Sequence, residues 1–245
     1  MGTDQIPFSR DDVKKALLRG EIASPELIPQ GSNQTFLVAV SDGSRAFKAV
    51  YKPSRGERPL WDFPSGTLHK REYASYLVSR ALRWDFIPLT VIRDGPFGPG
   101  SLQLWVDADP QSSYLTLREE RLEEMERIAL FDCLSNNADR KASHCFSDRD
   151  GHIWSIDHGL TFHVDPKLRT VIWDFAQEPI SVGLMEDVAT LLSTLGSPTA
   201  LSRELSHLLT PEEVDALKRR LQDLLVSGRF PDPDPSRRNV PWPWF

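Results

Sequence analysis

The chain has 245 residues, and its 29 basic and 35 acidic side chains give a formal net charge of −6. This acidic balance argues against a protein that coats nucleic acid, because such proteins usually carry a basic surplus. The 40% hydrophobic content is that of a globular chain with room for one large domain or two lobes.

The sequence also bears on the compartment. The two cysteines, Cys133 and Cys145, are too few for a disulfide framework and are expected to be reduced thiols. The longest unbroken apolar run covers five residues, 36–40, whereas a membrane-spanning helix needs about 20. We therefore expect a cytoplasmic protein that neither spans a membrane nor binds nucleic acid.

The first hundred residues alternate between helix and strand signals. Ser9 begins a capping-box-like sequence for a short helix that ends at Gly20. Asp42-Gly43 is a strong turn signal for a hairpin, and a helix with one apolar stripe follows farther along. The other predicted elements are strands at 35–40 and 45–51, a loop at 53–68, a helix at 68–84, a strand at 87–92, a loop at 95–100 and a strand at 102–106.

The second half has mainly helical patterns. Thr116 starts a capping box for a helix whose apolar face continues to Leu134. A turn at 148–151 indicates a second hairpin. The other predicted elements are strands at 144–146 and 153–156 and helices at 184–195, at 201–209 and from 210 onward.

These patterns predict an α+β chain in three parts. We expect an N-terminal lobe of residues 1–106, with a small antiparallel sheet and one helix, and a mostly helical lobe of residues 107–230. A tail rich in proline and tryptophan follows at 231–245, since the last 17 residues hold five prolines and two tryptophans. This tail either packs on the helical lobe through its aromatic rings or docks a partner.

Common nucleotide and hydrolase motifs are absent from the sequence, which has no P-loop, no Gly-x-Gly-x-x-Gly after a strand and no Gly-x-Ser-x-Gly. Three polar features lie at the ends of predicted elements instead. Gly31-Ser32-Asn33 precedes a strand and can present backbone N–H groups to an anion. Lys52 closes the next strand, where its ammonium can neutralise phosphate oxygens. Glu72, early in the following helix, can pair with Lys52 or simply favour the helix N-terminus.

The most specific pattern surrounds the second hairpin. Asp139 lies in the polar loop before this hairpin, His144 follows five residues later, and Asp157-His158-Gly159 comes directly after the hairpin. This order suits phosphoryl transfer, in which a loop aspartate orients and deprotonates the attacking hydroxyl. The residue five positions later and the strand-end aspartate would then hold Mg²⁺ against the phosphates.

Taken in order, these residues resemble the phosphatidylinositol 3-/4-kinase-like superfamily, particularly its small bacterial branch, and more distantly the HipA-type kinases. The resemblance covers about residues 30–175 and implies a two-lobed protein-kinase-like fold that uses ATP with Mg²⁺. It implies that Lys52 contacts phosphates, Glu72 anchors Lys52, Asp139 is catalytic and Asp157 binds the metal. It also implies a connector whose backbone meets the adenine, formed by Gln103, Leu104, Trp105 and Val106.

One residue departs from the superfamily pattern. His144 stands where the resemblance implies asparagine, and Mg²⁺ prefers oxygen ligands to imidazole. His144 is therefore either a metal ligand, with Mn²⁺ as the ion, or a group behind the ligands. The metal position is assigned to Asp157 and His144.

The sequence also bears on the phosphoryl acceptor and leaves two alternative functions open. Residues 160–179 offer only Lys167 and Arg169 against three acidic residues, which disfavours a phosphoinositide acceptor. We expect transfer of the γ-phosphate of ATP to another hydroxyl, on a small molecule or a protein. An ATP-binding pseudokinase or regulatory scaffold is the alternative, and a metal-dependent hydrolase using His144, His152 and His158 is a further one.

Overall fold

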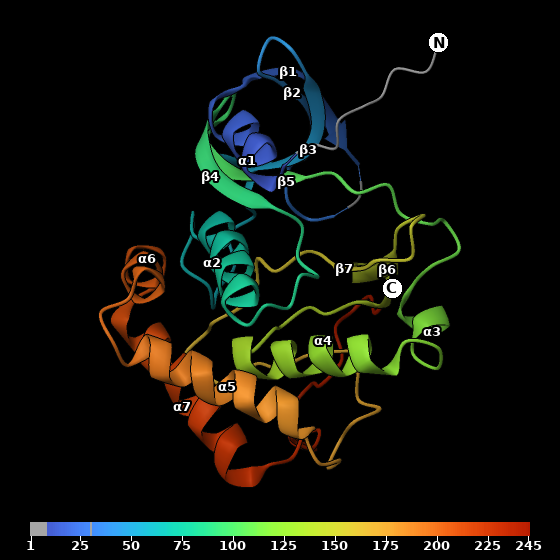
Figure 1. Cartoon of the computed structure of the whole chain (residues 1–245), viewed down its shortest axis with the longest axis vertical. Coiled ribbons are helices and arrows are strands. Elements are labelled where there is room, and N and C mark those ends of the chain that lie inside the picture. Colours follow the sequence, from blue (N-terminus) through green and yellow to red (C-terminus); the bar gives the residue numbers. More distant parts are fainter. Residues whose placement is uncertain (1–8, 30) are drawn as a thin grey trace. The chain divides into compact units, whose positions relative to one another are not determined.

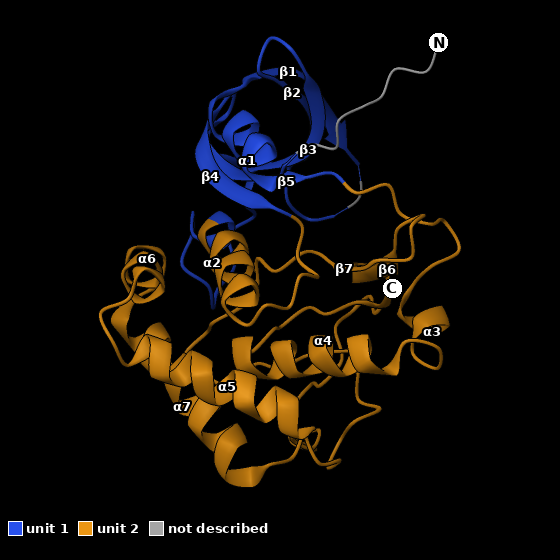
Figure 2. Ribbon diagram, viewed as in Figure 1, with its two compact units in different colours: residues 1–69, 89–105 blue, residues 70–88, 106–245 orange. Residues whose placement is uncertain are grey.

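The computed structural model describes residues 9–29 and 31–245 (Figure 1). Contacts between residues divide the chain into two compact units, coloured separately in Figure 2. Unit 1 contains residues 1–69 and 89–105, and unit 2 contains residues 70–88 and 106–245. Within the described ranges, every helix is too short or too polar to cross a membrane.

Unit 1 is built on a five-stranded antiparallel sheet with the strand order β1-β2-β3-β5-β4. Buried and partly exposed residues alternate along the middle strands, as expected of a sheet with one covered face. The elements of this unit are α1 (Arg10–Arg19), β1 (Glu21–Ile28), β2 (Thr35–Ser41), β3 (Ala46–Pro53), the 3₁₀ turn η1 (Ser54–Gly56), β4 (Thr90–Gly95) and β5 (Gly98–Leu104).

Both ends of helix α1 have hydrogen-bond partners. The Ser9 hydroxyl accepts a hydrogen bond from the Asp12 N–H, as the sequence predicts. At the other end, the Arg93 guanidinium donates to the carbonyls of Leu17 and Gly20, at 3.1 and 2.7 Å. A cation at this end also complements the helix dipole. Helix α1 is thereby fixed to strand β4 of the sheet.

The structure differs from the sequence-based expectation at two places in this sheet. Strand β1 was not predicted, because Ser24-Pro25 interrupts its pattern; the structure absorbs them in a bulge, with Ser24 at φ 51°. Residues 95–100 were predicted to be a loop, but most of them lie in β4 and β5, which join in a tight turn at Gly95–Gly98. Gly100 permits the pairing of β5 with β3, since a Cβ there would lie 2.5 Å from the Lys52 carbonyl oxygen.

Unit 2 is mostly helical and carries a two-stranded hairpin. Helix α7 packs against α4 and α5, and α6 lies beside α5 and α7 (Figure 1). With the sheet of unit 1, this confirms the predicted α+β class. The elements are α2 (Leu68–Ala81), which starts in unit 1, α3 (Tyr114–Leu117), α4 (Leu122–Ser135), the 3₁₀ turn η2 (Ala142–His144), β6 (Cys145–Ser147), β7 (Ile153–Ser155), α5 (Val182–Leu195), α6 (Ala200–Leu208) and α7 (Pro211–Ser227).

The single helix predicted from Thr116 to Leu134 is wrong, because the structure divides it into α3 and α4. Arg121 separates the two at φ −128° and ψ 51°, outside the helical region. Its side chain donates to the Gly151 carbonyl at 2.8 Å and pairs with Glu124. These contacts tie the start of α4 to the β6–β7 hairpin, and a continuous helix would place Arg121 differently.

Candidate active site

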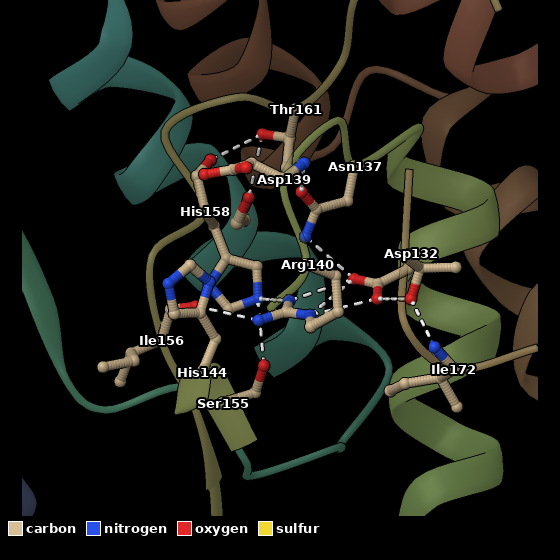
Figure 3. A network of polar contacts seen from close by, with 12 residues as sticks. Asp132, Asn137, Asp139, Arg140, His144, Ser155, Ile156, His158, Thr161 and Ile172 are labelled. Atoms are coloured by element: carbon tan, nitrogen blue, oxygen red, sulfur yellow. Dashed lines mark hydrogen bonds and ion pairs between the residues drawn. The ribbon is translucent and has the colours of Figure 1, made fainter. Parts of the chain in front are cut away.

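The loop after helix α4 is organised by a buried ion pair. Arg140 and Asp132 are both fully buried, with Arg140 Nη2 3.0 Å and Nε 3.1 Å from Asp132 Oδ1 (Figure 3). The guanidinium also donates to the Ile156 carbonyl at 2.9 Å and to His158 Nε2 at 2.8 Å. Since arginine is only a donor, His158 presents its Nε2 lone pair to this bond. One side chain thus joins helix α4 to the segment on either side of Asp157.

Asn137 and Asp132 shape the turn that carries Asp139. Asn137 Nδ2 donates to Asp132 Oδ1 at 2.9 Å, and Asn137 Oδ1 accepts from the Asp139 N–H at 3.0 Å. Asn136, at φ 55°, ends helix α4 in the left-handed conformation. Helix α4 therefore ends at Asn136, and the turn directly after it places Asp139.

Asp139 has an unusual proton affinity. Burial raises the pKa of its carboxyl to about 6, Lys141 lowers it, and the negative charge of Asp157 raises it further. The Lys141 ammonium lies 3.3 Å from Asp139 Oδ2. A carboxylate that titrates close to neutral pH can accept a proton from a hydroxyl and release it again.

Asp157 and His144 lie side by side because the hairpin pairs their backbones. The Ile156 N–H donates to the His144 carbonyl at 3.0 Å, and His144 Nε2 lies 3.4 Å from Asp157 Oδ2. The Asp157 side chain is 46% exposed and its φ is 61°. Residues other than glycine rarely adopt this conformation, and such outliers concentrate at functional sites.

Helix α2 holds the segment that follows Asp157. The Glu72 carboxylate accepts a hydrogen bond from the His158 N–H at 3.0 Å. The neighbouring Arg71 donates to the Thr161 carbonyl at 2.6 Å and forms a buried ion pair with Glu213. Unit 2 therefore carries four of the predicted site residues. Asp157 lies near both His144 and Asp139, and Glu72 contacts the backbone of His158, the residue after Asp157.

The other predicted site residues belong to unit 1 or to its boundary. Lys52 is on β3 opposite Ser101 of β5, and Gln103 on β5 donates to the Thr90 hydroxyl at 2.9 Å. The Asn33 side chain accepts from the Arg58 N–H at 2.8 Å. Gly31, Ser32 and Asn33 precede β2, Leu104 ends β5, and Trp105 and Val106 follow it.

The three histidines of the hydrolase alternative make separate contacts. His144 lies against Asp157, His152 Nε2 donates to the Asp85 carbonyl at 2.7 Å, and His158 accepts from Arg140. In the part of the chain that the structure describes, no group of three or more histidine, cysteine, aspartate or glutamate residues gathers as a metal site.

Sequence reasoning did not identify Asp132 and Thr170 as part of this site. Thr170 Oγ1 donates to Asp132 Oδ2 at 3.2 Å, and Thr170 lies beside Arg140 in a parallel bridge. Asp132 did give a signal, because it shares a helix face with the buried Met125 and Ile128. A charged residue on an apolar helix face needs a buried partner.

A small antiparallel sheet together with a mostly helical unit is the architecture of a protein-kinase-like fold, and solved kinase structures share it. The crystal structure of the Golgi casein kinase is similar at a TM-score of 0.52 and 16% identity, covering 89% of this chain and 74% of that one. The same kinase with Mn/ADP bound gives a TM-score of 0.56 at 15% identity, covering 91% and 80%.

The family of the chain follows from its sequence. Protein Rv2133c of Mycobacterium tuberculosis (strain ATCC 25618 / H37Rv) is 41% identical over 271 residues, covering 96% of each chain. The chain therefore belongs to the family of protein Rv2133c. No family model matches the sequence.

Proposed function

We propose that the chain is an ATP-dependent phosphotransferase that transfers the γ-phosphate of ATP to a hydroxyl acceptor. One observation carries this proposal. Asp139 lies in a loop held by buried hydrogen bonds, and its carboxyl has a pKa of about 6. The negative charge of Asp157, on the turn after the hairpin, contributes to raising this pKa. The protein-kinase-like fold supports the same conclusion. The resemblance to phosphatidylinositol 3-/4-kinases, which rests on the sequence alone, agrees with it.

Asp139 is the catalytic base in this proposal. It orients the acceptor hydroxyl and takes its proton as the oxygen attacks the γ-phosphorus. Burial keeps its pKa of about 6 close to cellular pH, where a base is both deprotonated and reactive. Lys141, 3.3 Å from Asp139, keeps the carboxylate from being protonated more fully.

Asp157 fits a hard divalent cation, since its carboxylate is half exposed and offers oxygen ligands. A bound Mg²⁺ or Mn²⁺ supplies positive charge that neutralises the phosphate oxygens. The similar structure of the Golgi casein kinase contains Mn/ADP. Asp157 is our candidate for the ligand.

His144 orients Asp157 in this proposal. Its Nδ1 accepts a hydrogen bond from the Lys141 N–H at 3.4 Å, so the neutral ring carries its hydrogen on Nε2. Nε2 lies 3.4 Å from Asp157 Oδ2. A ring nitrogen that carries its own hydrogen cannot at the same time bind a metal. We therefore assign His144 to the position behind the ligand.

The nucleotide itself is assigned to residues that the resemblance implies. The resemblance implies that Lys52 contacts the phosphates and that Glu72 anchors Lys52. Glu72 also accepts a hydrogen bond from the His158 N–H. Further binding residues are Gly31, Ser32 and Asn33 for phosphate and Gln103, Leu104, Trp105 and Val106 for adenine.

The acceptor is proposed to be a hydroxyl other than that of a phosphoinositide. The segment after Asp157-His158-Gly159, residues 160–179, has Lys167 and Arg169 against Asp165, Asp174 and Glu178. An anionic lipid headgroup would be repelled by this net acidic stretch.

Thermal unfolding with ATP and Mg²⁺ or Mn²⁺ tests nucleotide binding. ATP at about 100 times its dissociation constant is expected to add about 2.7 kcal/mol of stability, or roughly 5–10 °C in Tm. Asp157→Asn, which tolerates the same φ, is expected to lose most of this shift. Asp150→Asn, in the exposed hairpin turn, is the control and should keep it. A wild-type chain that shifts with neither metal contradicts the proposal.

A second prediction concerns His144. If His144 orients Asp157, His144→Ala should weaken ATP binding with Mg²⁺ and with Mn²⁺ by a similar factor of about 10–100. His144→Gln, whose amide N–H can still reach Asp157, should recover part of the loss. The dissociation constants are measured by calorimetry in each metal. Loss of binding with Mn²⁺ alone would instead make His144 a ligand.

A further inference from the structure

The C-terminal segment contacts the loop that carries the catalytic-type residues. The main-chain carbonyl of Trp244 accepts a hydrogen bond from the Ala142 N–H at 2.9 Å. Ala142 lies three residues after Asp139 and two before His144. It is also the first residue of turn η2. Its N–H has no acceptor within that turn, and Trp244 supplies one from about a hundred residues away.

A second contact is made with the segment that pairs with Arg140 of this loop. The Asn239 carbonyl accepts from the Thr170 N–H at 2.9 Å and from the Trp173 indole N–H at 3.1 Å. Thr170 lies beside Arg140 and donates to Asp132 through its hydroxyl. Asn239 therefore supports the strand-like segment that flanks Arg140, while Trp244 supports Ala142 directly.

The tail is held in shape by its own hydrogen bonds. Asn239 Nδ2 donates to the Asp234 carbonyl at 2.7 Å, and Asn239 Oδ1 accepts from the Asp234 N–H at 3.1 Å. Arg237 pairs with Asp234 and donates to the Pro166 carbonyl at 2.9 Å. The segment thus arrives at the loop already ordered, and its two carbonyls have defined positions.

Main-chain contacts, rather than aromatic burial, attach the end of this tail. Trp242, Trp244 and Phe245 are 74%, 44% and 57% exposed. Each of these rings therefore contributes less stability through apolar burial than a fully buried core residue does. The hydrogen bond from Ala142 is formed whichever side chain residue 244 carries.

We propose that residues 239–244 are a brace that positions the catalytic loop, with the Trp244 carbonyl as its direct contact. Residues 142–144 form only the short turn η2, so removal of the brace loosens this turn and with it the positions of His144 and the neighbouring Asp139. The effect on turnover rests on the proposed function. The effect on the loop itself does not.

Hydrogen exchange and steady-state kinetics test this proposal on the full chain. Deletion of residues 241–245 removes the Trp244 carbonyl. Ala142→Pro removes the donor instead, and proline suits the first position of a helical turn preceded by Lys141 at φ −93° and ψ 162°. Phe245→Ala is the matched control, because it removes an exposed ring and keeps the Trp244 carbonyl.

Both brace variants are expected to speed amide exchange in peptides covering residues 139–144 by about five- to tenfold, while α7 exchanges as in the wild type. We also expect kcat for ADP formation to fall by about tenfold or more. The KM for ATP should stay within about twofold of the wild-type value. Phe245→Ala should change neither quantity. If the deletion prevents folding, Ala142→Pro carries the test.

Unchanged exchange of the loop in a folded variant overturns the brace, and so does an equal effect of Phe245→Ala. Faster exchange with an unaltered kcat overturns its positioning role. Faster exchange in a chain whose wild type does not turn over ATP supports the brace and counts against the proposed function. The two proposals therefore fail by different results.

Discussion

Asp139→Asn is expected to stabilise the folded chain at pH 8 while removing its activity. The carboxyl has a pKa of about 6 in the folded protein against an ordinary value of 3.8, which at about 1.4 kcal/mol per pKa unit corresponds to about 3 kcal/mol. Solvent screening reduces this figure, because the side chain is 26% exposed. A gain of about 1–2 kcal/mol is the expected result of urea unfolding.

The sign of this effect depends on pH. Between about pH 4 and pH 6 the folded state keeps a proton that the unfolded state has lost, so stability falls as pH rises through this range. Above pH 6 the whole cost of the buried charge is present, and asparagine removes it. Below pH 4 the aspartate is neutral in both states, and the two proteins should have similar stability.

Asp148→Asn is the control with the opposite sign. Burial opposes ionisation of Asp148, but hydrogen bonds from the Trp154 indole and the His152 N–H outweigh it and lower the pKa of this carboxyl. Loss of its charge should therefore destabilise the chain at pH 8. If Asp139→Asn is equally destabilising, the carboxylate is not under strain and its assignment as a tuned base is wrong.

Activity should move in the other direction. Removal of a general base typically costs about 10²–10⁴ in rate, and asparagine cannot accept the acceptor's proton. A more stable variant with a rate of ADP formation lowered by this factor is the combination expected of a functional residue. A structural role alone would couple loss of rate to loss of stability.

Arg140→Met is expected to destabilise the chain by about 3–5 kcal/mol. The substitution leaves Asp132 as a buried charge without its counter-ion, and breaking a buried pair from one side has a cost of this size. It also removes the donors to Ile156 and His158, so the segment around Asp157 loses its support. Urea unfolding monitored by tryptophan fluorescence measures the difference.

Two further variants sharpen this test. Arg127→Met breaks an exposed pair with Glu123, 3.7 Å long, and is expected to cost less than about 0.5 kcal/mol. Asp132→Leu combined with Arg140→Met removes both charges and should be more stable than Arg140→Met alone. If the free energy of unfolding of Arg140→Met lies within about 1 kcal/mol of the wild-type value, the buried pair does not hold the loop.

Local sequence signals predicted the elements whose ends depend on a few neighbouring residues. Thr210 caps α7 through the Glu213 N–H, as its position before Pro211 indicates. The Asp148 turn joins β6 to β7, and that hairpin register is what brings His144 beside Asp157. The proximity of His144 and Asp157 could therefore be predicted from the sequence.

Contacts between distant segments were not predictable in the same way. Strand β1 exists because β2 pairs with it across the bulge at Ser24, and nothing local to residues 21–28 specifies that partner. Asp132 signals a buried partner by its place on an apolar helix face, but Arg140 reaches it only after the chain has left the helix. The contact of Trp244 with Ala142 joins residues far apart in the sequence and leaves no periodic trace.

The most direct measurement of the central proposal is the fate of ATP followed by ³¹P NMR. The wild-type chain is incubated with ATP, a divalent metal and a heat-treated cell extract as a source of both small-molecule and protein acceptors. We predict that the γ-phosphate signal declines and that ADP and a new phosphomonoester rise together, while Asp139→Asn leaves ATP intact. ATP that stays unchanged with both Mg²⁺ and Mn²⁺, or is consumed equally by Asp139→Asn, would contradict the assignment of this chain as a phosphotransferase with Asp139 as its base.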